Sequence, residues 1–73
     1  MGKLPVISGK EAVKAFSKMG WTVARQTGSH VIMVNHASPA LLSVPAHTEL
    51  KRGTLRNLIA DAGMTVEDFL SLL

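Results

Sequence analysis

Apolar and polar positions follow a helical period in the first part of the chain. Between residues 8 and 19 a stripe of apolar residues recurs at helical spacing, which is typical of an amphipathic helix. Ser8 and Glu11 have the spacing of a capping box, and Gly20 suits the left-handed position that ends such a helix. The pattern therefore predicts a first helix over residues 8–19.

Two stretches rich in β-branched residues come next, and a tight turn separates them. They cover residues 21–27 (WTVARQT) and 30–35 (HVIMVN). Gly28 and Ser29 between them fit a two-residue hairpin loop of type II′, which needs glycine at its first position. The pattern predicts an antiparallel hairpin whose second strand begins with a histidine, His30.

The second half of the chain changes from strand to helix. The predicted elements are a turn cluster at 36–40, a short strand at 41–44, a polar connection at 46–53, and two helices at 55–62 and 66–73. Thr65 and Asp68 give the last helix a capping-box pattern. The order α-β-β-β-α-α predicts an α+β fold, a three-stranded antiparallel sheet with helices packed on one face, as a single domain over residues 1–73.

Composition narrows the class of protein. The chain is 47% hydrophobic and 18% charged, as a folded domain is, and it has no cysteine for a disulfide or a thiolate metal site. It shows neither a secretory signal nor an apolar run long enough to cross a bilayer, so we expect a soluble, cytoplasmic protein. The net charge of +3 favours an anionic partner such as nucleic acid.

The hairpin brings His30 close to a cation. With a two-residue loop, Thr27 stands opposite His30, and Arg25 stands opposite Ile32. His30, Thr27 and Arg25 then share one face of the sheet. Further along the same face this register puts Val23 and Trp21. A change of one residue in the loop would move Arg25 to the other face, so its assignment depends on the register.

An imidazole near a guanidinium suits chemistry on a phosphate. Imidazole can accept or donate a proton at neutral pH, as RNA cleavage requires at the 2′-hydroxyl or the leaving 5′-oxygen. Cations would stabilise the charge on the phosphate, and the candidates are Arg25, Lys51 and Arg52. On spacing alone, a histidine at the start of a strand is usually an ordinary hydrogen-bonded surface residue beside the turn. A zinc site would need all three histidines, whose spacing matches no familiar ligand pattern, and no acidic cluster suggests a two-metal nuclease.

A row of lysines follows the predicted first helix. Lys10, Lys14 and Lys18 are four residues apart and therefore lie along one flank. The row is either a solvated face or a stripe that contacts phosphates without reading sequence.

Two other classes of function have some support. The last two helices could form a helix-turn-helix, but the helix at 66–73 has two acidic residues and no Lys or Arg, the wrong sign for DNA phosphates. A protein–protein adaptor is the other class. It would use an apolar sheet face opposite the helices, where we expect Val31, Met33 and Ala24.

The order of four segments is more informative than any one of them. They are ISGKEAVKAFSKMGW, RQTGSH, VPAH and ELKRGTLRNLIADAGMTVEDFL. In this order they resemble the HicA/YcfA-like toxin family along nearly the whole chain. The most telling segment is Gly28-Ser29-His30 after Arg25-Gln26. The chain departs from the family in having Lys51-Arg52-Gly53-Thr54 where KPGT is common, and an apolar run after the histidine.

The resemblance implies a fold, an activity and a partner. The fold would be like a double-stranded-RNA-binding domain, and the activity would be a ribosome-independent endoribonuclease that cleaves mRNA. A HicB-type antitoxin would neutralise it by covering the active site. We expect no metal or other cofactor, no membrane and no DNA partner. A non-catalytic RNA-binding module of the same fold is the alternative.

The resemblance also assigns residues. The family's catalytic histidine follows Gly-Ser and corresponds to His30, while Gly28 and Ser29 serve turn geometry. His47 matches the histidine of the VPxH stretch and is an auxiliary candidate. Arg25, Lys51, Arg52, Lys10 and Lys14 remain the candidates for binding RNA phosphates.

Overall fold

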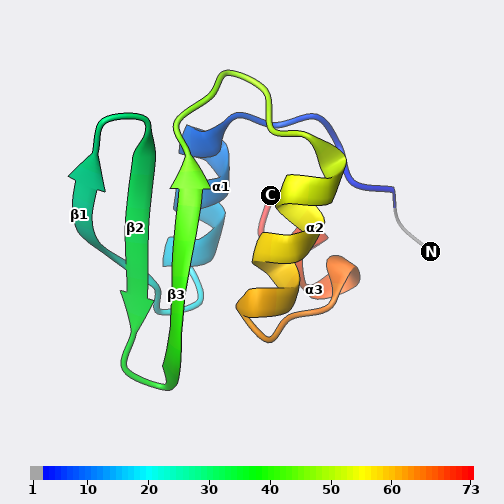
Figure 1. Cartoon of the computed structure of the whole chain (residues 1–73). Coiled ribbons are helices and arrows are strands. Elements are labelled where there is room, and N and C mark those ends of the chain that lie inside the picture. Colours follow the sequence, from blue (N-terminus) through cyan, green and yellow to red (C-terminus); the bar gives the residue numbers. More distant parts are fainter. Residues whose placement is uncertain (1–2) are drawn as a thin grey trace.

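The computed structural model describes residues 3–73 and has the predicted element order. The elements are α1 (Gly9–Ser17), β1 (Thr22–Thr27), β2 (His30–Asn35), β3 (Ser38–Pro45), α2 (Arg52–Asp61) and α3 (Val66–Leu70). The strands form one antiparallel sheet in the order β1-β2-β3, and the helices lie on one side of it (Figure 1). The predicted α+β class is confirmed, and the arrangement is consistent with a fold like a double-stranded-RNA-binding domain.

Local signals in the sequence correctly predicted where α1 and α3 begin. Ser8 and Thr65 each accept a hydrogen bond from the backbone N–H three residues on, and both capping boxes are complete. Gly20 has the positive φ expected after α1. The bounds of the helices differ from the predicted ones, since α1 ends at Ser17, α2 begins at Arg52 and α3 ends at Leu70.

None of the helices in the described residues is long and apolar enough to cross a membrane.

The third strand is longer than the sequence predicted. It covers Ser38–Pro45, so the predicted turn cluster at 36–40 is wrong beyond Ala37. Pro39 suggested a turn because proline has no N–H to give to a sheet. β3 is an edge strand, however, and one of its sides has no neighbouring strand to receive hydrogen bonds. Proline is therefore tolerated there.

A β-bulge at Ala24 changes which side chains share a face. Arg25 pairs with Ile32 as predicted, but Val23 pairs with Met33, so Ala24 is an extra residue in β1. The bulge turns Val23 toward the helices. The prediction that Val23 and Trp21 share the face of His30 is therefore wrong, and Trp21 is buried.

The predicted exposure of Val31 and Met33 is also wrong. Met33 is fully buried, and Val31 packs against the core, because their partners Leu42 and Val44 face the helices. The open face of the sheet instead carries Ile32, whose partner is the exposed Ser43. The apolar surface expected for a protein adaptor is thus part of the core.

The core lies between the sheet and the three helices. Phe16 of α1 and Phe69 of α3 are fully buried, with ring centroids 5.1 Å apart. The sheet and α2 complete the cluster with Met33, Leu42, Val44, Leu55, Leu58 and Ile59. Burial of each such side chain contributes about 1.5–3 kcal/mol, which a domain of this size needs because its surface is large relative to its volume.

The segment before α1 runs beside the connection between β3 and α2. The N–H of Gly9 donates to the carbonyl of His47 (2.9 Å), and the N–H of Leu50 donates to the carbonyl of Ile7 (2.8 Å). Gly9 is buried in the first turn of α1. A Cβ on Gly9 would collide with the carbonyl oxygen of Pro45 and lie 3.2 Å from the Cα of Ala46. Only glycine allows this approach of the two backbones.

We therefore expect Gly9→Ala to destabilise the fold by about 1–3 kcal/mol, the usual cost of overpacking. The collision is with backbone atoms, which cannot rotate away as a side chain can. Urea denaturation followed by circular dichroism would measure the change in the free energy of unfolding.

Gly53→Ala is the matched control. Gly53 lies in α2, and its added Cβ would meet nothing within 4 Å. Alanine favours a helix over glycine by about 1 kcal/mol, so this variant should be as stable as the wild type or more so. Equal stability of the two alanine variants would contradict the proposed contact.

Candidate functional site

His30 is the first residue of the central strand, at the end of the sheet where the β1–β2 hairpin turns. Its neighbours across the sheet are Thr27 on β1 and Pro45 on β3. The next residue, Val31, packs against the core, so His30 projects from the open face. Its side chain is half-buried. The sheet therefore supports the imidazole on both sides and leaves it accessible from the face without helices.

The turn before His30 holds the imidazole by a hydrogen bond. Gly28 has φ +46°, and Ser29 has no positive φ, as in the predicted type II′ turn. The Oγ of Ser29 lies 3.2 Å from the Nδ1 of His30. Within residues 3–73 the Nε2 of His30 has no hydrogen-bond partner. Ser29 thus contacts the ring directly as well as forming the turn.

Backbone contacts fix this turn to the rest of the fold. The N–H of Ala46 donates to the carbonyl of Ser29 (2.7 Å), and the next residue, His47, accepts the hydrogen bond from Gly9. The connection after β3 therefore joins the hairpin turn to the start of α1. The sequence pattern did not predict this role for Gly9 or Ala46, and its one signal is a glycine at a helix start.

Arg25 lies on the same face as His30, as predicted. It pairs with Ile32, two residues along β2 from His30, so the two side chains are diagonal neighbours across the β1–β2 pair. Arg25 is exposed. A long side chain at this position can reach a phosphate bound beside the imidazole.

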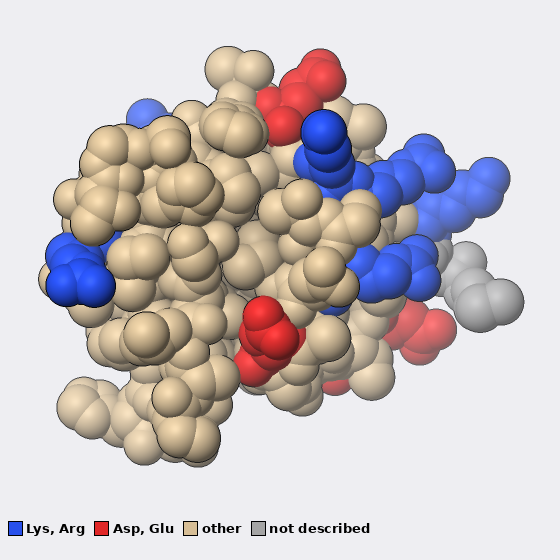
Figure 2. Space-filling view, viewed as in Figure 1, with Lys and Arg blue, Asp and Glu red and all other residues tan. Residues whose placement is uncertain are grey.

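Lys51 and Arg52 lie at the start of α2, and Arg25 lies on β1 at the far edge of the sheet from β3. Figure 2 shows the largest group of Lys and Arg atoms on the side of α2 and a smaller group on the side of β1, with a mostly uncharged surface between them. Lys51 caps α2 and Arg52 begins it, and both are exposed. The sequence had grouped Lys51 and Arg52 with Arg25, but the structure separates them across the sheet face.

The lysine row on α1 is divided as well. Lys10 and Lys14 are exposed, whereas the Nζ of Lys18 donates to the carbonyl of Leu72 (2.7 Å). Lys18 thus holds the C-terminal turn against α1. Lys10 and Lys14 remain candidates for binding phosphates, as predicted from the resemblance.

A comparison with protein-family models identifies the family of this chain. The family model described as "HicA toxin of bacterial toxin-antitoxin" matches residues 9–64 of the 73-residue chain. The chain belongs to the HicA toxin family. The resemblance inferred from the sequence is confirmed, and family membership implies an antitoxin partner. A comparison with curated proteins gave no match.

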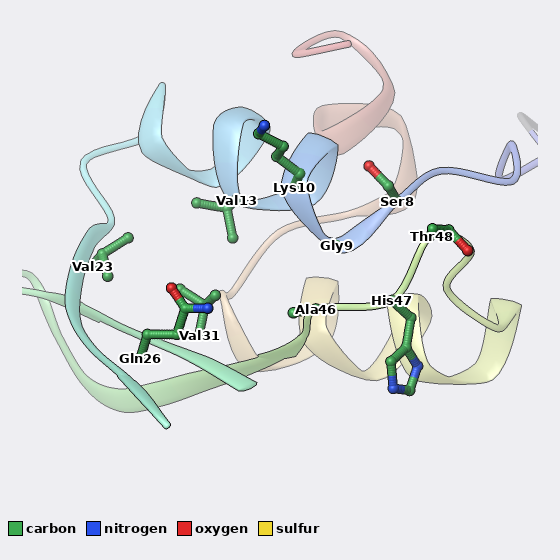
Figure 3. Close-up of a pocket in the computed structure, with 10 residues that line it drawn as sticks. All are labelled: Ser8, Gly9, Lys10, Val13, Val23, Gln26, Val31, Ala46, His47 and Thr48. Atoms are coloured by element: carbon green, nitrogen blue, oxygen red, sulfur yellow. The ribbon is translucent and has the colours of Figure 1, made fainter. Parts of the chain in front are cut away.

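The other two histidines of this HicA-family chain lie outside β2, the strand that His30 begins. His36 is exposed in the turn between β2 and β3, at the other end of the strand. His47 contributes its backbone carbonyl to the contact with Gly9, and its imidazole points away from α1 (Figure 3). Among the described residues no group of three or more His, Cys, Asp or Glu is placed to hold a metal ion.

Proposed function

We propose that this HicA-family chain is a cytoplasmic endoribonuclease that cleaves mRNA with His30 as its general base, without the ribosome and without a metal. A HicB-type antitoxin that covers the open face around His30 would neutralise it. The observation that carries the proposal is the placement of His30, half-buried at a turn, with Nδ1 held by Ser29 and Nε2 directed to no other group of the described chain.

The proposed reaction is an internal transesterification. The Nε2 of His30 takes the proton of the 2′-hydroxyl, and the 2′-oxygen forms a bond to phosphorus. The bond from phosphorus to the 5′-oxygen breaks, and water supplies the proton to that oxygen. The products are a 2′,3′-cyclic phosphate and a 5′-hydroxyl. For Nε2 to accept the proton, Nδ1 must carry a hydrogen, which it donates to the Oγ of Ser29.

Cations on different elements have different roles in this proposal. Arg25 shares the face of His30 and stabilises the charge on the reacting phosphate. Lys51 and Arg52 begin α2, beyond β3, and contact phosphates of the flanking RNA. Lys10 and Lys14 add contacts along α1. Contacts of this kind position RNA without choosing its sequence.

A non-catalytic RNA-binding module is the second candidate function. The exposed cations on α1 and α2 favour it, because they can bind RNA without any chemistry at His30. Cleavage and binding must therefore be measured separately.

Substitution of the imidazole tests the proposal. We expect His30→Ala to lower the cleavage rate of an end-labelled RNA by about 10²–10⁴-fold in the presence of EDTA, because general-base catalysis contributes about this much. The product of the wild type should end in a 2′,3′-cyclic phosphate. Circular dichroism of both proteins checks that the fold is retained.

His36→Ala is the matched control, because His36 is exposed at the other end of β2. It should cut at the rate of the wild type. A folded His30→Ala protein that also cuts at that rate would reject His30 as the base. RNA binding by the wild type without cleavage would instead support the binding module, and a 3′-hydroxyl product would point to attack by water.

Removal of the Ser29 hydroxyl tests the positioning of the ring. We expect Ser29→Ala to lower kcat by about 2–10-fold with little change in KM, since one hydrogen bond contributes about 0.5–1.5 kcal/mol. Ser29→Thr keeps a hydroxyl and should restore most of kcat. A rise in KM alone, or no rescue by threonine, would show that Ser29 acts through the turn and not through the imidazole.

A further inference from the structure

A cleft of about 500 Å³ lies on the other side of the β1–β2 hairpin from His30. The start of α1, the helix-facing side of β1 and β2, and the connection after β3 form its walls (Figure 3). Its volume is in the range of sites that bind small organic groups. His30 is not among its lining residues.

The apolar part of the cleft exists because α1 does not cover β1. Every residue of β1 is exposed, although Val23 faces the helix side after the bulge at Ala24. Val23 is 51% exposed, and across the cleft from it lies Val13 of α1, which is half-buried. Together with Val31 and Ala46 these side chains provide an apolar surface that nothing in residues 3–73 fills.

Polar groups at the edge of this surface suggest what it binds. The side chain of Gln26 lies beside Val31 (Figure 3) and has no hydrogen-bond partner within the described residues. A carboxamide can both donate to and accept from the edge of a nucleobase. Lys10 adds a positive charge, and none of the lining residues is acidic. An apolar surface, a free amide and a cation are complementary to a base and its phosphate.

We propose that the cleft binds the base of an unpaired nucleotide of the RNA substrate and that Gln26 selects that base. This inference rests on the proposed function. Gln26 directly precedes Thr27, and Val31 directly follows His30. Their side chains are therefore on the face opposite to that of the Thr27–His30 pair. The RNA strand therefore passes around the hairpin turn, with one base in the cleft and a nearby phosphodiester at His30. Sequence-specific recognition of RNA generally uses such unstacked bases.

Binding can be tested without cleavage. The probes are 2′-O-methyl pentanucleotides that differ only in the central base, because they lack the 2′-hydroxyl nucleophile. We expect one or two of them to shift the NMR signals of the Val13, Val23 and Val31 methyl groups in a saturable manner. Nuclear Overhauser effects from base protons to these methyl groups are also expected. The Val6 methyl groups, which are exposed outside the cleft, should not shift.

Two variants sharpen the test. Gln26→Ala should reduce the difference in Kd between the preferred and the other bases by about 2–10-fold, the value of one hydrogen bond. Val23→Phe should narrow the cleft and weaken binding of every probe by at least about 10-fold. Val6→Phe is the matched control and should leave every Kd unchanged.

Different results would overturn the cleft as a base site and the proposed function at His30. Probes that shift only signals of the open face, or that do not bind at all, overturn the cleft as a base site. Shifts in the cleft that appear only when an antitoxin is added also overturn it and identify a protein contact. In each case cleavage of RNA by the wild type and not by His30→Ala would leave the proposed function in place.

Discussion

The close approach of α1 to the end of β3 is the constraint on which the candidate site depends. Gly9 lacks the side chain that would collide with Pro45, so the first turn of the helix can lie directly on the strand end. The backbone hydrogen bond from Gly9 to His47 then fixes the connection after β3. That connection in turn donates a hydrogen bond from Ala46 to Ser29. A glycine far from His30 in the sequence thus sets the position of the turn that precedes it.

The hydrophobic core and the candidate site use different faces of the same sheet. The buried side chains Met33, Leu42 and Val44 all point to the helices. His30 and Arg25 point the other way and contribute little to the core. Substitutions on the open face therefore change the candidate site at small cost to folding, whereas truncation of the buried side chains on the helix side destabilises the whole domain.

Local signals made much of this structure predictable, and tertiary constraints explain the remainder. The caps at Ser8 and Thr65 and the turn at Gly28 depend on neighbouring residues alone, so the sequence was sufficient to place them. The bulge at Ala24 was not predictable from local pattern. β1 begins directly after Trp21, and the burial of Trp21 depends on tertiary packing. The approach of Gly9 to Pro45 depends on the path of a distant segment, which no local pattern records.

The β1–β2 hairpin is the part of the fold where both faces of the sheet are accessible. The buried side chains of the sheet belong to β2 and β3, whereas all six residues of β1 are exposed. The bulge places their side chains on two faces, with Arg25 on the face of His30 and Val23 in the cleft on the other. A flexible single strand can contact both faces by bending around the turn, whereas a rigid duplex cannot. Under the proposed function, the segment of RNA that meets this hairpin is therefore single-stranded.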